Sequence, residues 1–525
     1  MLSRRGNRLL THTSTFSWRT LSTTLPRSAV YVLPIDPRSP SSAAKNVDAA
    51  TLWNSTPTGK AKKPANAGTT RIFYDTPRGT GAQGKDVTVL TSLGDKWVTK
   101  IGEERREVIR KAVGSAVKAT RGLGDGVDGE TVLVDASVDP HAAAVASHLA
   151  LYDFTLKTKP TSQFDPRNTN PLPGRLELRS LVGGDAKAWD EGVVYARAQN
   201  LARTLSELPG NMMTPTAFTE RIKAEFAGLS NVEIFVRDQA WASEKGMRTF
   251  LSVAKGSSEP CKFLEIHYKG ATSDVQPLMF VGKGVTFDTG GISIKPAAGM
   301  ELMRGDMGGA AAVCSAALAI AQLKLPANLV VLCPLTENMP GPSANKPGDI
   351  VYAMNGKSIQ IDNTDAEGRL ILAGNLNEVP DALYYGTTEY KPHSVVDVAT
   401  LTGAMMVALG EVYTGAFTNS DSLWRDLEKA GKTEHDLFWR MPLSDAYAPQ
   451  ITSSNADLCN IGGRDAGSCT AALFLKSFVE GVELAEENAG GEPRVRWAHL
   501  DIAGTMESTR GNEYQGKGLT GRPTR

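Results

Sequence analysis

The sequence predicts an α/β protein with two domains: a smaller N-terminal α/β domain, and a larger C-terminal α/β domain whose mixed central sheet is flanked by helices. The length of 525 residues exceeds that of one ordinary domain. Hydrophobic residues make up 41% of the chain, which is enough to build large buried cores. Segments with the pattern of strands alternate with amphipathic helical segments along most of the chain, which is typical of α/β folds.

The first 35 residues differ in composition from the rest of the chain. Residues 1–30 contain five arginines and many serines and threonines, and no acidic residue precedes Asp36. This composition is typical of a mitochondrial transit peptide, whereas a secretory signal needs a continuous apolar core that this stretch lacks. We therefore expect residues 1–35 to direct import into the mitochondrial matrix; the alternative is a basic tail on a cytoplasmic protein. Residues 36–67, rich in Ser, Pro, Ala and Lys, are expected to form a partly disordered linker.

Residues 68–183 are expected to form the smaller domain, because two strand patterns alternate there with two helical ones. Asp86–Leu93 and Thr131–Asp135 have the composition of strands. Glu103–Thr120 and His141–Phe154 carry apolar residues at helical spacing.

Residues 184–210 are expected to form a helix that connects the domains. Apolar residues recur at helical spacing over Ala186–Glu207, and the pattern stops at Pro209 and Gly210.

Residues 211–525 are expected to form the larger domain, because the alternation of strands and helices resumes there on a larger scale. Helices are expected over 308–323, 366–377 and 468–480. The stretch Met307–Leu323 is uncharged, but it is rich in Ala and Gly and slightly short for a bilayer, so we expect a buried helix and no membrane partner. The expected strands are Val232–Val236, Phe263–Tyr268, Leu278–Val281, Leu329–Cys333, Val395–Ala399 and Val495–Ile502.

The charge balance and the cysteines narrow the classes of function. The chain has 57 Lys and Arg against 57 Asp and Glu, so nothing in its net charge favours binding to nucleic acid or to an anionic membrane. The five cysteines are scattered without a CxxC pair, which argues against a disulfide scaffold and favours a reducing compartment.

Several short motifs resemble catalytic signatures but lack essential parts. Gly124–Gly129 matches GxGxxG, yet it follows a helix and precedes a strand, which is the reverse of a dinucleotide site. Gly356–Ser358 lacks the upstream glycine of a phosphate loop, and Gly291–Lys295 has Lys where a nucleophile elbow needs Gly. His499 lies within an apolar strand pattern, and we expect it to be a hydrogen-bonded core histidine.

Acidic residues concentrate in two stretches, residues 281–306 and residues 361–370, beside glycines that allow sharp turns. If the fold brings these side chains together, they repel and cannot all stay ionised. Two divalent cations would neutralise four carboxylates, and oxygen ligands suit zinc, manganese, cobalt or magnesium. The alternative, separate turn formers and surface charges, is equally compatible with the spacing alone. The four carboxylates are those of Asp288, Asp306, Asp365 and Glu367.

The two acidic stretches and several other blocks resemble the leucyl aminopeptidases of the M17 metallopeptidase family, the cytosol aminopeptidase type. The family signature NTDAEGRL is intact at Asn363–Leu370. The similarity covers most of residues 197–525, whereas residues 68–183 resemble the family only loosely. It includes the blocks at 200–218, 281–296, 337–350, 399–410 and 497–505. The resemblance implies a dinuclear-metal aminopeptidase domain over residues 211–525.

The resemblance also implies a ligand set for two divalent metal ions, zinc or manganese, with magnesium or cobalt as alternatives. One ion is expected on Lys283, Asp288, Asp306 and Glu367, and the other on Asp288, Asp365 and Glu367. Lys283 can bind a metal only as the neutral amine, so an adjacent dication has to lower its pKa. Lys295 is expected to stabilise the oxyanion that develops during peptide hydrolysis, and Arg369 to hold a bicarbonate ion that shuttles a proton.

The remaining implications concern the substrate and the assembly. The family pattern implies short peptides with a free N-terminus and a leucine-like first residue, and a homohexamer. A structural or nucleic-acid-associated member of the family is the alternative. The segment between Arg369 and Thr400 looks longer than usual in the family, and Pro380 is expected to interrupt the helix after the signature. The residues expected to bind substrate are Met303, Asn363, Thr400, Leu401, Gly403, Ala503 and Met506.

Overall fold

The computed structural model describes residues 29–44, 47–55, 65–77, 85–123, 131–158, 176–181, 185–353, 355–373, 382–483 and 491–525. The chain divides into two compact units. One comprises the N-terminal part up to Asn200 together with Ser508–Gly518, and the other comprises Leu201–Glu507 and Leu519–Arg525. The two-domain α/β class expected from the sequence is confirmed.

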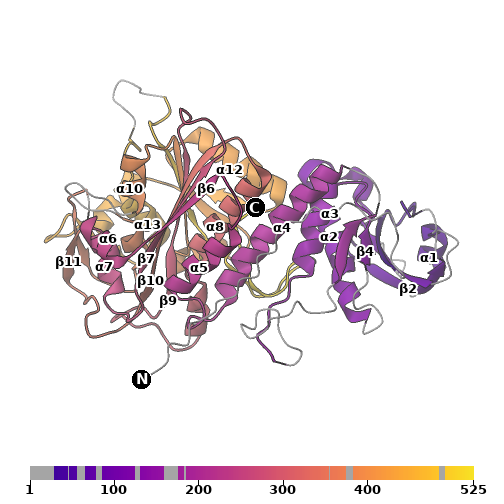
Figure 1. Cartoon of the computed structure of the whole chain (residues 1–525), viewed down its shortest axis with the longest axis horizontal. Coiled ribbons are helices and arrows are strands. Elements are labelled where there is room, and N and C mark those ends of the chain that lie inside the picture. The colour runs from indigo at the N-terminus through magenta and orange to yellow at the C-terminus, as the bar shows by residue number, and fades with distance from the viewer. Residues whose placement is uncertain are drawn as a thin grey trace. The chain divides into compact units, whose positions relative to one another are not determined.

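The N-terminal unit is built on a five-stranded sheet of order β2-β3-β1-β4-β5, drawn in indigo and purple in Figure 1. β1, β3, β4 and β5 run parallel, and β2 pairs antiparallel with β3. The strands are β1 (Ala29–Ile35), β2 (Thr70–Pro77), β3 (Lys85–Ser92), β4 (Thr131–Val134) and β5 (Glu177–Ser180). The helices are α1 (Ala49–Ser55), α2 (Gly102–Thr120) and α3 (Pro140–Ala150), with single 3-10 turns at Trp97–Thr99 and Arg121–Leu123.

β1 is the central strand of this sheet, and every one of its residues is buried. Its sequence AVYVLPI is a continuous apolar run, as expected for a parallel strand covered on both faces. Successive side chains point to opposite faces. Val30 and Val32 join the core formed with α2 and α3, and Tyr31 and Leu33 join the core that contains Trp53 of α1.

The sequence-based boundaries of this unit were wrong. β1 falls within residues 1–35, which were assigned to the transit peptide, and α1 falls within the predicted linker 36–67. The folded unit therefore includes Ala29, well before residue 68. The prediction was wrong because the five arginines dominate the composition of residues 1–30, and the short apolar run that begins at Ala29 was not recognised as a strand.

The predicted catalytic range 211–525 is also interrupted, because Ser508–Gly518 packs into the N-terminal unit. The Tyr514 hydroxyl donates to the Glu107 carboxylate of α2 at 3.2 Å. A Cβ atom at Gly114 would lie 2.4 Å from the Tyr514 Cβ, so glycine is needed for this close approach. Nothing in the local sequence pattern distinguishes this return segment from the rest of the C-terminal region.

The larger unit is built on a nine-stranded mixed sheet of order β15-β14-β17-β13-β8-β10-β7-β6, with β9 paired to β10 (Figure 1). Its strands are β6 (Val232–Arg237), β7 (Lys262–Lys269), β8 (Leu278–Gly282), β9 (Gly284–Asp288), β10 (Asn328–Asn338), β13 (Ser394–Ala399), β14 (Thr414–Thr418), β15 (Phe438–Arg440) and β17 (Arg496–Asp501). β8, β9, β10, β13 and β17 are parallel, so their carboxyl ends meet at one edge. A small sheet joins β11 (Asp349–Tyr352), β12 (Ser358–Ile361) and β16 (Leu458–Cys459), and β18 (Glu507–Ser508) pairs with β19 (Gly518–Leu519).

Helices accompany the strands of the larger unit. They are α5 (Pro215–Glu225), α6 (Gln239–Glu244), α7 (Arg248–Ala254), α8 (Gly308–Leu323), α9 (Gly368–Leu372), α10 (Ala382–Glu389), α11 (Gly403–Leu409), α12 (Asp421–Glu434) and α13 (Gly467–Lys476), with 3-10 segments at Met300–Gly305 and Asp445–Ile451. α4 (Ala186–Glu207) spans the range expected for the connecting helix, and the boundary between the units falls within it.

Several predicted helix ends differ from the structure. α3 ends at Ala150, four residues before the predicted end at Phe154. α9 covers only Gly368–Leu372 of the predicted 366–377, and Pro380 lies outside the described residues, as does the motif at 124–129.

The buried character of α8 is confirmed. The stretch Met300–Leu323 is long and apolar enough to cross a membrane by length and composition, but 78% of its apolar window is buried inside the protein. Its alanines and glycines allow close packing: a Cβ atom at Gly309 would lie 2.0 Å from the Val398 carbonyl oxygen of β13. α8 is therefore a core helix of the larger unit.

Candidate metal centre

Two of the predicted ligands lie at the carboxyl ends of parallel strands of the main sheet, where sites form in open α/β sheets. Lys283 directly follows β8, and Asp288 is the last residue of β9. Asp306 lies between the 3-10 segment Met300–Gly305 and α8. Asp365 and Glu367 lie in the signature loop between β12 and α9. Segments far apart in the sequence thus supply one site.

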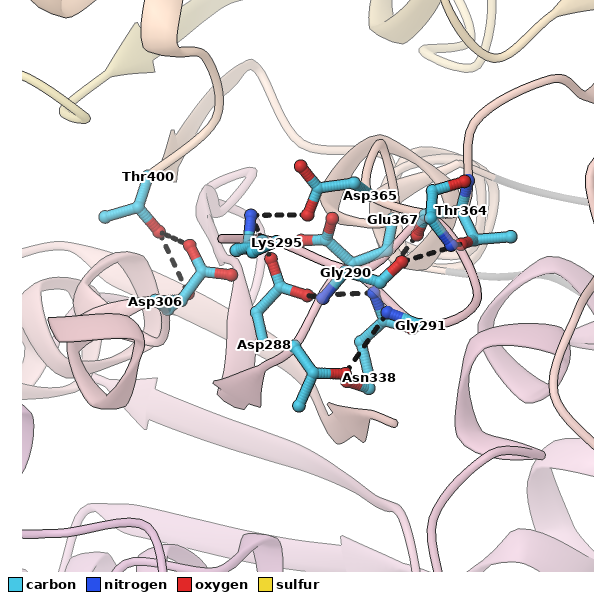
Figure 2. Close-up of polar contacts among 12 residues, drawn as sticks. Asp288, Gly290, Gly291, Lys295, Asp306, Asn338, Thr364, Asp365, Glu367 and Thr400 are labelled. Carbon is cyan, nitrogen blue, oxygen red and sulfur yellow. Dashed lines mark hydrogen bonds and ion pairs between the residues drawn. The ribbon is translucent and has the colours of Figure 1, made fainter. Parts of the chain in front are cut away.

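The structure brings all five predicted ligands together with Lys295. Carboxylate oxygens of Asp288, Asp365 and Glu367 lie within 4.8 Å of one another. The Lys283 Nζ lies 2.9 Å from Asp306 Oδ1 and 2.8 Å from Glu367 Oε1. The Lys295 Nζ lies 2.8 Å from Asp288 Oδ2 and also pairs with Asp365 (Figure 2). This clustering excludes the alternative of separate turn formers and surface charges.

Two glycines make room for these side chains. Gly290 has a φ of +86°, and a Cβ atom there would lie 2.9 Å from Asp365 Oδ1. A Cβ atom at Gly368 would lie 2.6 Å from the Lys283 Cε. Glycine at these positions lets the two acidic segments approach each other and lets Lys283 reach the carboxylates.

The donor set fits divalent cations. Asp288 and Glu367 are each only 2% exposed. Among the residues that the structure describes, the buried Asp306 Oδ2 has no hydrogen-bond partner. A buried carboxylate oxygen without a donor is costly, and a cation would satisfy it. Hard oxygen ligands with one nitrogen are a suitable environment for zinc, manganese, cobalt or magnesium.

The carboxylates of the cluster differ in their pKa values. Burial, followed by the charge of Glu367, raises the pKa of Asp288 to about 6, although Lys295 opposes the rise. Burial also raises the pKa of Asp306 and of Asp365. Burial opposes ionisation of Glu367 too, but the ammonium groups of Lys283 and Lys295 outweigh it and lower its pKa. Protons and cations therefore compete for the same oxygens.

The negative charge of the carboxylates raises the pKa values of the two lysines, Lys283 and Lys295. Burial opposes the charged form of Lys283, but Asp306, Glu367 and Asp288 together raise its pKa. The same carboxylates raise the pKa of Lys295 against burial. A dication in the cluster would reverse the balance at Lys283, because a positive neighbour favours the neutral amine.

Arg369 lies in α9, two residues after Glu367, and is 6% exposed. In the described part of the chain, its Nε and Nη1 atoms have no hydrogen-bond partner. Burial lowers the pKa of Arg369 to about 10, while the charges of Glu367 and Asp501 oppose this. A buried, charged guanidinium with unpaired donors can hold a small anion.

Of the predicted substrate residues, Thr400 contacts the cluster, and Leu401 and Ala503 bind a common carboxylate. Thr400 Oγ1 donates to Asp306 Oδ1 at 2.8 Å, and the Thr400 carbonyl accepts from Lys283 Nζ at 2.8 Å. Asp501 Oδ1 accepts the backbone N–H groups of Leu401 at 3.3 Å and Ala503 at 3.1 Å, which draws these two loops together.

The other predicted substrate residues lie in the signature loop (Asn363), in the 3-10 segment (Met303), at the start of α11 (Gly403) and just after Ala503 (Met506). The Asn363 side-chain oxygen accepts the Asp365 N–H at 2.9 Å. Met506 lies against Gly305, in the 3-10 segment that carries Met303, since a Cβ atom at Gly305 would lie 2.4 Å from the Met506 Cε. No heavy atom lies within 4 Å of a Cβ atom built at Gly403, among the residues described. This glycine therefore leaves open space.

The sequence pattern did not single out several polar residues that hold the site. Asn338 donates to Asp288 Oδ1 at 2.8 Å, and Asn460 Nδ2 donates to the Asn363 carbonyl. Asn338 ends β10 in register with Asp288 of β9, and Asp501 ends β17 in register with Ala399 of β13. Their places depend on strand register, which the local sequence does not signal. His499 is fully buried and bonds through Nδ1 to Asp397 Oδ1 at 2.5 Å, so the prediction of a core histidine is confirmed.

Comparisons with known proteins identify the family of the chain. The model of the Peptidase_M17 family, described as the cytosol aminopeptidase family, catalytic domain, matches residues 200–525. Cytosol aminopeptidase of Homo sapiens is 47% identical over 472 residues, covering 88% of this chain and 83% of the human protein. That of Xenopus tropicalis is 46% identical over 471 residues, covering 87% and 82%. These alignments are longer than the family match, so the similarity extends into the N-terminal unit.

A solved structure shows the same fold. The bottromycin maturation enzyme BotP in complex with Mn has a TM-score of 0.74 and 29% sequence identity to this chain, covering 95% of this chain and 97% of BotP. Sequence, fold and site thus agree, and the chain belongs to the cytosol aminopeptidase (M17) family of metal-dependent aminopeptidases, which are hydrolases that act as exopeptidases.

Proposed function

We propose that this enzyme removes leucine-like residues from the free N-terminus of short peptides with the help of two divalent ions. The observation that carries the proposal is the buried cluster of carboxylates around Lys283 and Lys295. Lys283, Asp288, Asp306 and Glu367 would hold one ion, and Asp288, Asp365 and Glu367 the other. Zinc or manganese is the expected metal, with magnesium or cobalt as alternatives. When bound, the ions would lower the pKa of a water molecule and polarise the peptide carbonyl.

Lys295 is placed to stabilise negative charge that develops on the substrate. Its ammonium group lies 2.8 Å from Asp288 Oδ2, and 21% of the Lys295 side chain is exposed, so the side chain lies at the edge of the acidic cluster. The carboxylates raise the pKa of Lys295, which keeps it charged at neutral pH. A fixed ammonium at the edge of a buried site stabilises an oxyanion more strongly than water does.

Arg369 would hold a bicarbonate ion that accepts and returns the proton. Its unpaired Nε and Nη1 atoms supply the donors, and its own guanidinium stays protonated at neutral pH. The arginine therefore binds and orients the anion and does not itself act as the base.

The preference for leucine-like residues follows from the apolar surroundings of the cluster. Met303 and Met506 would supply flexible apolar surface. No heavy atom of the described residues lies within 4 Å of a Cβ atom built at Gly403, so this position leaves open space. Apolar pockets discriminate only weakly among aliphatic side chains, with about 10- to 200-fold preference per methylene. We therefore expect a graded preference among leucine, methionine and similar residues.

The test uses the purified full-length protein and a leucine anilide. Chelator should abolish cleavage, and zinc or manganese should restore it. The matched control is the same anilide with an acetylated amine, which should resist cleavage because the free N-terminus is required. Equal cleavage of the blocked substrate, or no turnover by folded and metal-loaded protein on any unblocked peptide, would refute the proposal.

We also propose mitochondrial import and a homohexameric assembly. Because β1 is the central strand of its sheet, a presequence has to be cut upstream of Ala29. A C-terminal fluorescent fusion should colocalise with mitochondria, whereas a cytosolic signal would support the cytoplasmic alternative. Light scattering should give six times the 56.0 kDa of the chain, less the cleaved presequence. The alternative of a structural or nucleic-acid-associated protein is not favoured, because the family's ligand set is intact.

A further inference from the structure

Asn338 is a buried amide that lies beside the acidic cluster. It is the last residue of β10 and pairs in parallel register with Asp288, the last residue of β9. Only 5% of Asn338 is exposed. Two neighbouring strands thus end at the same level, which places an amide side chain next to a predicted bridging ligand.

The contacts of Asn338 connect the two acidic segments. Its Nδ2 donates to Asp288 Oδ1 at 2.8 Å and to the Thr364 carbonyl at 3.1 Å (Figure 2). Its backbone carbonyl accepts from both the N–H and the hydroxyl of Thr289, at 3.0 Å and 2.8 Å. One residue therefore holds the end of β9 on one side and the signature loop on the other.

The two oxygens of Asp288 consequently differ. Oδ1 accepts from the Gly290 N–H at 2.8 Å and from Asn338 Nδ2 at 2.8 Å. Oδ2 lies 2.8 Å from the Lys295 ammonium, on the side of the other carboxylates. A carboxylate oxygen offers two lone pairs, so the two donors occupy Oδ1 and leave Oδ2 to face the cluster.

We propose that Asn338 is a positioning residue that fixes which oxygen Asp288 presents to the metal ions. This inference rests on the proposed metal-dependent function. Outer residues that orient a ligand typically change metal affinity or activity by about 10- to 100-fold when they are removed. Asn338 holds the carboxylate through a charge-assisted hydrogen bond in a buried setting, which is the condition for such an effect.

A purely structural role would give a different result, and Asn419 is the matched control. Its Nδ2 donates to the carbonyls of Val482 at 2.8 Å and Val495 at 3.1 Å, and its Oδ1 accepts the Trp497 N–H at 2.8 Å. Asn419 thus makes a similar number of bonds, but all of these bonds go to backbone groups outside the acidic cluster. Its replacement should weaken the fold without changing the metal site.

The experiment titrates Mn²⁺ alone into the chelator-stripped full-length protein and measures affinity by calorimetry. We expect Asn338→Leu to bind Mn²⁺ about 10- to 100-fold more weakly than wild type. Its kcat at fixed subsaturating Mn²⁺ should fall while KM changes little, and added Mn²⁺ should restore much of the kcat. Asn419→Leu should lower the melting temperature and leave the Mn²⁺ affinity unchanged.

Asn338→Ser, which is smaller and polar, replaces Asn338→Leu if the latter does not fold. Wild-type affinity in the folded Asn338 variant, or an equal loss in Asn419→Leu, would overturn the inference while the proposed function stands. A wild-type protein that binds no Mn²⁺ would overturn the proposed function and this inference together, so the two failures are distinguishable.

Discussion

Replacing Gly368 by Ala tests the geometry around Lys283 directly. The added Cβ would lie 2.6 Å from the Lys283 Cε, so the side chain must retreat by about 0.8 Å to reach an ordinary contact of 3.4 Å. The Lys283 ammonium cannot move easily, because Asp306, Glu367 and the Thr400 carbonyl all lie within 2.9 Å of it. To relieve the steric clash, Lys283 would therefore have to lose at least one of these three polar contacts.

The size of the effect follows from the contact that is lost. A hydrogen bond to a charged group contributes about 1.5–3 kcal/mol, so losing one corresponds to about 10- to 100-fold in Mn²⁺ affinity and in kcat/KM. Gly368 is the first residue of α9 and has no positive φ, so its backbone conformation is compatible with alanine. We therefore expect a melting temperature close to that of wild type together with a clear loss of metal and activity.

The assay compares Mn²⁺ titration, kcat/KM on a leucine anilide and thermal unfolding. Gly122→Ala is the matched control, because no heavy atom of the described residues lies within 4 Å of a Cβ atom built at Gly122. It should leave the metal affinity and the activity unchanged. If Gly368→Ala retains wild-type Mn²⁺ affinity and kcat/KM, Lys283 is not held as described and the reasoning is refuted.

Two further predictions concern catalysis, one concerns the pH dependence of stability and metal affinity, and one concerns the fold. Lys295→Met should lower kcat by about 10²- to 10³-fold while calorimetry still detects bound Mn²⁺, and a loss of metal binding alone would contradict the oxyanion role. Arg369→Ala should lower kcat by about 10²-fold or more and abolish any stimulation by added bicarbonate, so a bicarbonate response that persists in the variant would count against it. Because the folded pKa of Asp288 is raised to about 6, the metal-stripped protein should lose stability as pH rises through that value, whereas its Mn²⁺ affinity should increase. Thermal unfolding with and without metal from pH 4 to 8 measures both trends. Slopes of the opposite sign would refute the prediction. Deleting Ala29–Ile35 as well as residues 2–28 should abolish the cooperative unfolding of the N-terminal unit, whereas deleting 2–28 alone should not.

Much of the fold could be predicted from periodicity, because long apolar patterns dominate the local choice of structure. α2, α4 and α8 lie within a residue of their predicted ends, since each combines helical spacing with a clear start or stop. Central strands such as β13 read as short apolar runs. β1 was missed because a short apolar run beside an arginine-rich stretch carries little compositional weight.

The candidate site could be predicted only in part, for a related reason. The spacing of acidic residues in the sequence indicated two acidic stretches. The family signature then identified the side chains expected to bind the metal ions together, such as Asp365 and Glu367. Asn338 and Asp501 were not predicted as site residues, because their positions depend on the register between strands that are distant in sequence. No local sequence pattern encodes that register, so the Asn338 amide and the Asp501 carboxylate can be identified only once the folded sheet is known.

The return of Ser508–Gly518 to the N-terminal unit has a consequence for biosynthesis. The Tyr514 side chain packs beside Gly114 and comes from a segment that is synthesised after most of the catalytic region. The N-terminal unit therefore cannot complete its core while the ribosome is still translating the catalytic region. A nonsense mutation shortly before Tyr514 should therefore damage the N-terminal unit, which is made before the catalytic region.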